Sequence, residues 1–243
     1  MKLKITIGSW LGILLFVAGM LLGLSHSASI TWGQAESFLY TSFTADSRFG
    51  VRCPLMLSPD ESGVLHAKIA NFTDENILPV VFVEISHSGA PRRVDQTVSL
   101  ASHEAKVIQW TVNPSDVVYG RLILVNVLQA RYRDNPSFLG SCGILLFSLF
   151  GLTGFETFTL LTFVSPAGMV GGGVLWWKAR QPLDTFSASF ARINAVLMGI
   201  TILAMLSTFP HWWGLTLFLD ALTLLVFGVI ITDFVLFPKK DRS

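Results

Sequence analysis

The sequence predicts an α + β membrane protein in which four transmembrane helices carry one antiparallel β-sandwich, inserted between the first helix and the second. Three observations lead to this prediction. Apolar residues make up 51% of the 243 residues and charged residues only 14%, about half the charged share of an ordinary soluble protein. Long uncharged runs occupy both ends of the chain, and alternating polar and apolar residues lie between them. Apolar surface this abundant exceeds what a soluble core of this size can bury, so we expect it to face lipid.

Residues 1–28 are predicted to be an N-terminal transmembrane helix that acts as a signal anchor. The uncharged run Ile5–Leu24 follows two lysines and has 20 residues. At about 1.5 Å per residue it reaches across a hydrocarbon core of about 30 Å. A cleaved signal peptide is the alternative, because Ser25 and Ser27 are small enough for a cleavage site. The apolar region of a signal peptide usually has about 7–15 residues, which favours retention of this longer run.

Residues 29–136 are predicted to form an extracytoplasmic β-sandwich of immunoglobulin-like type. In the run from Val64 to Phe72, apolar residues alternate with His66 and Lys68. A period of two with one apolar face is typical of a strand that a core covers on one side. Segments rich in Pro, Gly, Asn and Asp separate the runs, and about seven short strands of this kind fit such a sandwich. The candidate strands are Phe38–Phe43, Gly50–Leu57, Val64–Phe72, Pro79–Ser86, Gln96–Ala101, Lys106–Val112 and Arg121–Ala130.

One turn in this region adds a family resemblance. A strand closed by Asn71 is followed by Leu100–Glu104, with the sequence Leu-Ala-Ser-His-Glu, directly before the strand Lys106–Val112. This order resembles bacterial cell-surface immunoglobulin-like modules of the adhesion-related type. In those modules a Leu-Ala-Pro-Gly-Glu-like turn often precedes the penultimate strand, and here Ser-His replaces Pro-Gly. The resemblance covers less than half of the chain and implies a fold, not an activity.

The placement of positive charge decides how the apolar C-terminal half crosses the membrane. If Phe138–Phe155 were a crossing, the basic residues around Lys178 and in the C-terminal tail would lie outside, against the positive-inside rule. We therefore expect an interfacial or re-entrant apolar segment at 137–156; a long tilted helix starting near Phe147 would give the same topology. Both termini are then cytoplasmic in the cell (plasma) membrane. The remaining predicted segments are transmembrane helix 2 at 157–178, a cytoplasmic loop at 179–192, transmembrane helix 3 at 193–209, transmembrane helix 4 at 212–237 and a cytoplasmic tail at 238–243.

The second predicted crossing contains a proline and a cluster of glycines. Proline removes a backbone hydrogen bond, and glycine leaves the helix surface without side-chain cover. One interpretation is that the glycines let a neighbouring helix approach closely. The alternative is a broken helix that lines a substrate path. The residues concerned are Pro166, Gly168, Gly171, Gly172 and Gly173.

Asp220 is an ionisable residue inside the fourth predicted crossing. It lies eight residues into the run from Trp212, at a depth of about 12 Å along a helix. A charged group at that depth costs a few kcal/mol or more unless it is paired or hydrated. We expect its partner to be Thr216, Ser207, Thr208 or a basic residue of another subunit. The favoured interpretation is a structural hydrogen bond or a subunit contact, and the alternative is transport chemistry.

The cysteines and histidines offer few further sites. Cys53 and Cys142 both fall on the outer side of this topology, where an oxidising compartment favours a disulfide; two buried free thiols are the alternative. There is no Cys-x-x-Cys, and the five histidines include no pair at i, i+3 or i+4, so we predict no metal site. His211 is a candidate ligand for haem or chlorophyll, or simply an interfacial histidine. Asn71 begins an Asn-Phe-Thr glycosylation sequon.

No catalytic, phosphate-binding or nucleic-acid-binding motif occurs in the sequence, so we predict neither an enzyme nor a cofactor nor a nucleic-acid partner. The leading hypothesis is a non-enzymatic accessory or scaffold subunit of a multi-subunit membrane complex, with the outer β-sandwich as a protein-interaction module. Its partners would be the lipid bilayer and other membrane protein subunits. One alternative is a small transporter or channel component that uses Pro166–Gly173 and Asp220. A second alternative is a stand-alone surface sensor or adhesin.

Overall fold

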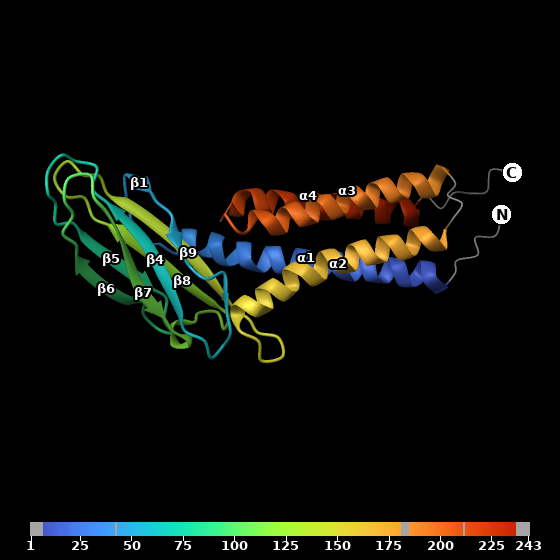
Figure 1. Ribbon diagram of the computed structural model, residues 1–243, viewed down its shortest axis with the longest axis horizontal. Coiled ribbons are helices and arrows are strands. Elements are labelled where there is room, and N and C mark those ends of the chain that lie inside the picture. Colours follow the sequence, from blue (N-terminus) through green and yellow to red (C-terminus); the bar gives the residue numbers. More distant parts are fainter. Residues whose placement is uncertain (1–6, 42, 181–184, 211, 237–243) are drawn as a thin grey trace. The chain divides into compact units, whose positions relative to one another are not determined.

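The computed structural model describes residues 7–41, 43–180, 185–210 and 212–236 (Figure 1). The chain divides into two compact units, which are described separately. The helical unit comprises Met1–Thr31 and Thr159–Ser243, and the β-unit comprises Trp32–Phe158. The helices are α1 (Ile7–Tyr40), α2 (Gly154–Ala179), α3 (Thr185–Ser207) and α4 (Trp213–Leu236).

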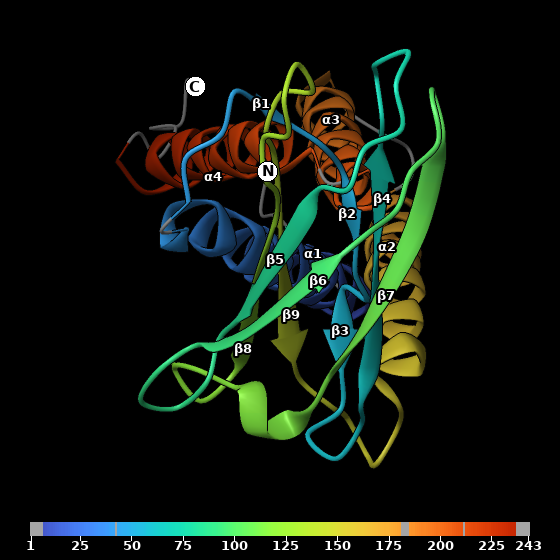
Figure 2. The same cartoon turned by 90° about the vertical axis from the view of Figure 1, so that its left-hand side faces the viewer.

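The β-unit is built from two sheets (Figure 2). The larger sheet has the order β1-β9-β8-β5-β6, with β3 also paired to β9, and the smaller sheet has the order β2-β4-β7. Strands β1 and β3 both run parallel to β9, so the prediction of a wholly antiparallel arrangement is wrong at these two pairs. The strands are β1 (Ser47–Arg48), β2 (Val51–Arg52), β3 (Met56–Leu57), β4 (Gly63–Ala70), β5 (Val80–Ile85), β6 (Arg92–Thr97), β7 (Ala105–Val112), β8 (Leu122–Gln129) and β9 (Phe138–Leu146), and a 3-10 helix, η1 (Pro114–Asp116), lies between β7 and β8.

A single apolar core lies between the two sheets. Along β4 the side chains of Leu65, Ala67 and Ile69 are buried, whereas Lys68 is exposed. This is the burial pattern that the period of two predicts for a strand with one covered face. The buried residues of β4 belong to the same core cluster as residues of β5, β8 and β9, among them Val83. The inner faces of both sheets therefore contribute to one core.

Strand β9 corrects the prediction of an interfacial or re-entrant segment at 137–156. Residues Phe138–Leu146 form a strand in the interior of the larger sheet, and β9 pairs with β8 from Phe138 opposite Gln129 to Leu145 opposite Leu122. Both β8 and β9 are buried on their two faces along most of their length. A strand covered on both sides has no polar face, so its sequence is a continuous apolar run that resembles a membrane segment.

Three other predicted boundaries differ from the structure. Helix α1 extends well beyond the predicted 1–28, and the first half of the predicted strand Phe38–Phe43 lies within its last turn. The predicted strand Gly50–Leu57 is divided into β2 and β3, and Gln96–Ala101 overlaps only the end of β6. The β-unit also exceeds the predicted range 29–136, because β9 and the loop after it belong to it.

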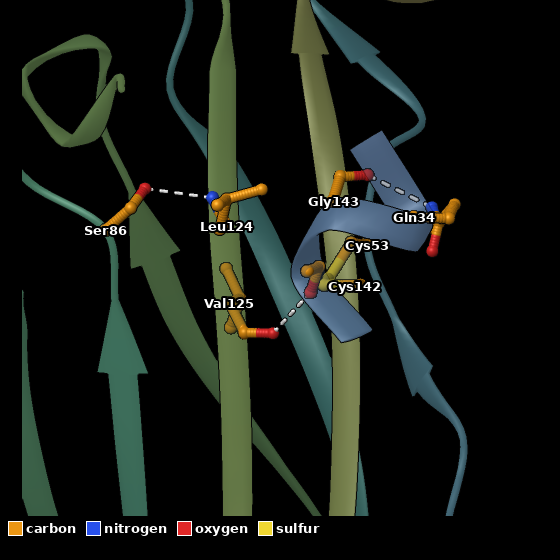
Figure 3. Close-up of a disulfide and its surroundings, with 8 residues drawn as sticks. Gln34, Cys53, Ser86, Leu124, Val125, Cys142 and Gly143 are labelled. Atoms are coloured by element: carbon orange, nitrogen blue, oxygen red, sulfur yellow. Dashed lines mark hydrogen bonds between the residues drawn. A yellow bond between two sulfur atoms is a disulfide. The ribbon is translucent and has the colours of Figure 1, made fainter. Parts of the chain in front are cut away.

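The last turns of α1 cover the outer face of β8 and β9 (Figure 3). The side-chain amide of Gln34 donates a hydrogen bond to the carbonyl oxygen of Gly143 over 3.0 Å, and the hydroxyl of Ser37 donates to the carbonyl oxygen of Val125 over 3.1 Å. A Cβ atom at Gly143 would overlap the carbonyl oxygen of Gly33. Only glycine at this position lets the helix lie so close to the strand.

We expect Gly143→Ala to destabilise the β-unit by about 1–3 kcal/mol, the usual cost of forcing extra atoms into a packed site. Gly50→Ala is the matched control, because a Cβ atom at Gly50 has no atom within 4 Å. Chemical denaturation of the purified protein in detergent, followed by near-ultraviolet circular dichroism, measures the difference. Equal stabilities of the two variants would contradict the close approach of α1 to β9.

A disulfide joins Cys53 and Cys142 (Figure 3). Cys53 directly follows β2 of the smaller sheet, and Cys142 lies in β9 of the larger sheet with its side chain in the core. The two residues are 89 positions apart in the sequence. The bond therefore closes a long loop and links one sheet to the other.

We expect the double substitution Cys53→Ala/Cys142→Ala to lower the free energy of unfolding by about 2–5 kcal/mol, because the unfolded chain regains the entropy of an open loop. Differential scanning calorimetry of the wild type, with and without a reducing agent, gives an independent estimate of the same loss. A wild type whose stability is unaffected by reduction would argue against a structural disulfide.

Among the described residues, three helices are long and apolar enough to cross a membrane, namely α1, α2 and α4. The prediction of membrane-spanning helices is confirmed at this level. The described apolar part of α3, Ala191–Ser207, is too short to be counted with these three helices. Helix α3 begins at Thr185, inside the predicted cytoplasmic loop of 179–192. The predicted tail, 238–243, lies outside the described residues.

Candidate functional site

Helices α1 and α2 pack against each other through facing glycines. A Cβ atom at Gly12 would lie 2.6 Å from the backbone nitrogen of Trp176, and one at Gly172 would lie 2.5 Å from the carbonyl oxygen of Gly12. Real Cβ atoms do not approach backbone so closely, so these positions require glycine. Small residues allow this kind of approach between membrane helices. We call the contact the glycine seam; it comprises Gly12, Gly19 and Gly23 of α1 and Ser165, Gly168 and Gly172 of α2.

Helix α2 continues without interruption through Pro166. The interpretation of residues 166–173 as a broken helix is therefore wrong. The neighbouring Ser165 contributes to the glycine seam, since its hydroxyl donates a hydrogen bond to the carbonyl oxygen of Gly19 over 2.8 Å. The hydroxyl of Ser165 thus joins α2 to the backbone of α1. It does so next to Pro166, which has no backbone N–H to donate.

A second side of α2, about 90–130° around the helix from the glycine seam, also carries small residues. Ala167 is exposed, and a Cβ atom at Gly171 would meet nothing within 4 Å. The two residues are four positions apart, so they lie one above the other on the same side of the helix. Of the predicted glycines, Gly168 and Gly172 lie in the seam, whereas Gly171 and Gly173 face open space. We call Ala167 and Gly171 the small-residue face of α2.

Asp220 of α4 is bound by a residue of α1. The hydroxyl oxygen of Ser27 lies 2.8 Å from Oδ1 and 3.1 Å from Oδ2 of Asp220, so this hydroxyl donates to the carboxylate. Asp220 is only 6% exposed. Two of the expected partners instead pair with each other, because the hydroxyls of Ser207 and Thr216 lie 2.7 Å apart. A third, Thr208, directly follows α3 and donates to the backbone carbonyl of Met205 in that helix.

A second titratable residue, His26, precedes Ser27 on α1. It is 4% exposed, and its Nε2 lies 3.3 Å from the hydroxyl of Thr162 on α2. Successive residues of a helix point about 100° apart. Helix α1 therefore directs His26 toward α2 and Ser27 toward α4. We call His26, Ser27, Thr162 and Asp220 the polar layer of the helical unit. Of its members, sequence reasoning singled out only Asp220, because the four residues come from three separate segments and no local pattern links them.

We expect Ser27→Ala to lower the stability of the helical unit by about 1.5–3 kcal/mol, the range for a hydrogen bond to a charged group. Ser25→Ala is the control, since Ser25 lies on the exposed side of the same turn. Reversible unfolding in mixed micelles with increasing dodecyl sulfate measures both variants. The pairing of α1 with α4 would be refuted by a Ser27→Ala variant that is as stable as Ser25→Ala.

The glycosylation, haem-ligand and metal-site predictions concern other residues. Asn71 is buried, and its side-chain amide donates to the carbonyl oxygens of Glu75 and Ala101 over 2.7 and 2.8 Å. A glycan on this buried nitrogen would replace one of its two hydrogens and so remove at least one of these bonds. The candidate ligand His211 lies outside the described residues. Within the described part of the chain, no group of three or more His, Cys, Asp or Glu could hold a metal ion.

The hollows on the described surface of the β-unit include two open ones. One, of about 240 Å³, is lined by the chain after α1 and by β1 and β9, and includes Arg48. The other, of about 370 Å³, lies beside the disulfide and includes Arg52, Glu61 and His66. The second hollow also includes Ser62, but its hydroxyl donates to Oδ1 of Asn113 over 3.0 Å and not to Glu61 or His66.

Comparisons with known proteins do not assign the chain to a family. No family model matches the sequence, and no curated protein matches it either. Solved structures that resemble parts of the chain include a β-glucosidase from Erythrobacter marinus, with 19% identity and a TM-score of 0.32 over 44% of this chain. Another is the CARDB domain of the PF1109 protein from Pyrococcus furiosus, solved with di-metal ions, with 16% identity and a TM-score of 0.31 over 44% of this chain and 100% of that domain.

A third similar structure is β-glucuronidase 2 of Bacteroides uniformis, with 14% identity and a TM-score of 0.30 over 40% of this chain. The aligned regions span only 16% of the β-glucosidase and 12% of the β-glucuronidase. Likenesses of this size and score assign neither an activity nor a family to the chain. The function must therefore be argued from the chain's own residues.

Proposed function

We propose that the chain is a non-enzymatic accessory or scaffold subunit of a multi-subunit membrane complex. The observation that carries this proposal is the small-residue face of α2. Within its own unit α2 already uses Gly168 and Gly172 to contact α1. On its second side, Ala167 and Gly171 leave the helix backbone open to a further close neighbour. In lipid, such a face favours the approach of another helix, because van der Waals packing drives helix association there.

The membrane topology that we propose has four crossings, with both termini in the cytoplasm. Helix α3 has 23 residues, a length of about 34 Å that is sufficient for the hydrocarbon core. Lys178 lies in the last turn of α2 and Arg192 near the start of α3, which supports a cytoplasmic location for this connection. The β-unit is then extracytoplasmic, where an oxidising compartment maintains the disulfide. Its two sheets around one core support an immunoglobulin-like sandwich.

The β-unit would serve as the protein-interaction module. Strand β7 pairs with β4 on one side only and stands at an edge of the smaller sheet. On its outer face the exposed Val107 lies between Ala105 and the polar Gln109, which are also exposed. An exposed edge strand of eight residues offers backbone groups to an added strand, a common mode of peptide recognition.

A small transporter or channel component is the second candidate, and the polar layer is the observation that favours it. His26 and Asp220 are two titratable residues buried in one layer of the helical unit. Ionisable residues inside membrane segments often belong to proton or ion pathways. In this alternative the path follows the polar layer, since α2 is not broken at Pro166.

Paired substitutions in α2 test the accessory role. We expect Gly171→Leu to remove a stoichiometric partner after purification from native membranes in mild detergent, because the side chain fills the small-residue face. Its thermal stability should equal that of the wild type, since Gly171 has open space around it. Gly172→Leu is the contrasting variant, and we expect it to destabilise the helical unit because it enters the glycine seam. Mass spectrometry of the intact complexes identifies the subunits.

Two results would contradict the accessory role. One is a wild-type protein that purifies from native membranes only as a monomer or a homodimer. The other is a Gly171→Leu variant that keeps every partner of the wild type. Loss of ion-coupled uptake in Asp220→Asn, with the oligomeric state unchanged, would favour the transporter instead.

A further inference from the structure

A tight turn after β9 holds an exposed phenylalanine in a left-handed backbone conformation. The turn spans Leu149–Leu152 and is closed by a hydrogen bond from the backbone N–H of Leu152 to the carbonyl oxygen of Leu149 over 2.9 Å. Its central residues are Phe150, with φ of 54°, and Gly151, with φ of 77°. Positive φ at both central positions is the mark of a type I′ turn.

A second turn of the same kind precedes β8. It spans Val118–Arg121 and is closed by a hydrogen bond from the N–H of Arg121 to the carbonyl oxygen of Val118 over 3.2 Å. Its central residues are Tyr119, with φ of 52°, and Gly120, with φ of 69°. Each turn therefore has an aromatic residue followed by glycine. We call them the aromatic turns.

Within the β-unit, burial offers no reason for an aromatic residue at these two positions. The first central position of a type I′ turn favours Asn, Asp or Gly, because a bulky side chain at positive φ crowds the backbone. Such strain is normally offset by packing. Phe150, however, is 95% exposed and Tyr119 is 67% exposed. A strained residue that is held out of its own fold points to a contact outside that fold.

Both aromatic turns lie at one end of the larger sheet. The N–H of Leu146, the last residue of β9, donates to the carbonyl oxygen of Arg121 over 2.8 Å, so the turn before β8 lies beside the end of β9 from which the chain runs into the turn at Leu149. Helix α1 enters the β-unit at the same end, where Gly33 lies against Leu122 and Gly143. The chain leaves this end again toward α2, which begins at Gly154.

The opposite end of the sheets has a different chemistry. The other non-glycine residues with positive φ among the described residues are His103 and Arg133, with φ of 55° and 51°. His103 precedes β7 and Arg133 follows β8, so both lie at the far end from the aromatic turns. The non-glycine residues with positive φ are therefore aromatic at the end of the sheets where the chain continues into α1 and α2. At the opposite end they are polar.

We propose that Phe150 and Tyr119 insert into the headgroup region of the bilayer and seat this end of the β-unit on the lipid surface. Phe150 stands four residues before α2, a candidate membrane span, so an extended chain places it within about 14 Å of the start of that helix. Residues 147–153 carry no charge, and Phe147 is also exposed. Aromatic side chains favour this interfacial zone, because the ring can contact the acyl chains while the backbone that carries it stays among the polar headgroups.

Site-directed spin labelling of the full chain in phosphatidylcholine vesicles tests the proposal. Both native cysteines are bonded to each other, so a nitroxide reagent labels only an introduced thiol. The test variants are Phe150→Cys and Tyr119→Cys. The matched controls are Phe72→Cys and Arg133→Cys, which replace exposed residues at the opposite end of the sheets. The measurement compares the collision rates of each label with oxygen, which concentrates in lipid, and with a water-soluble nickel chelate.

We expect the ratio of oxygen to nickel collisions to be several-fold higher at positions 150 and 119 than at positions 72 and 133. The label is the same at all four sites, so its own affinity for lipid does not account for a difference. Equal ratios at the four positions would overturn the proposal. It would also be overturned if the label at 150 were water-accessible in vesicles but immobilised in native membranes, since the contact would then be a protein.

Discussion

The close approach of α1 and α2 is the contact on which the rest of the helical unit depends. Lipid tails are as apolar as leucine, so burial of apolar side chains does little to hold membrane helices together. The glycine seam supplies packing instead, since its residues bring backbone against backbone where no side-chain atom fits. This approach brings His26 within reach of Thr162, and on its other side α1 presents Ser27 to Asp220. The polar layer thus depends on where the seam places α1.

Helix α1 packs in both units through glycines that let its backbone lie close to a neighbouring element. Its first turns pack through Gly12 and Gly19, and its last turns pack through Gly33 against Gly143 of β9. Between them lie the polar residues that bind neighbouring elements. The two surfaces proposed for outside contacts are separate from this packing: the small-residue face of α2 suits a helix, and the aromatic turns suit lipid. The accessory role and the lipid contact therefore concern surfaces, whereas the transporter alternative concerns the buried polar layer.

The sequence predicted strands with one covered face, such as β4, and misjudged β9, which is buried on both faces. Strand β4 shows its period of two directly, because Leu65 faces the core and Lys68 faces water. Strand β9 shows no period, since α1 covers its outer face, and an uncharged run of that kind is shared by buried strands and membrane helices. Ser27 could not be found as the partner of Asp220, because 193 residues separate them and no local pattern links such positions.

Cross-linking across the glycine seam tests this account most directly. A Cβ atom at Gly8 would lie 3.7 Å from the Cβ atom of Ala179, within the range of about 3.5–4.5 Å that a disulfide spans. In native membranes treated with a mild oxidant, Gly8→Cys/Ala179→Cys should form a bond within one chain, identified by mass spectrometry of the linked peptides. The control Gly8→Cys/Gly173→Cys should remain unlinked. A bond in the control and none in the first variant would show that α1 and α2 do not pack through their glycines.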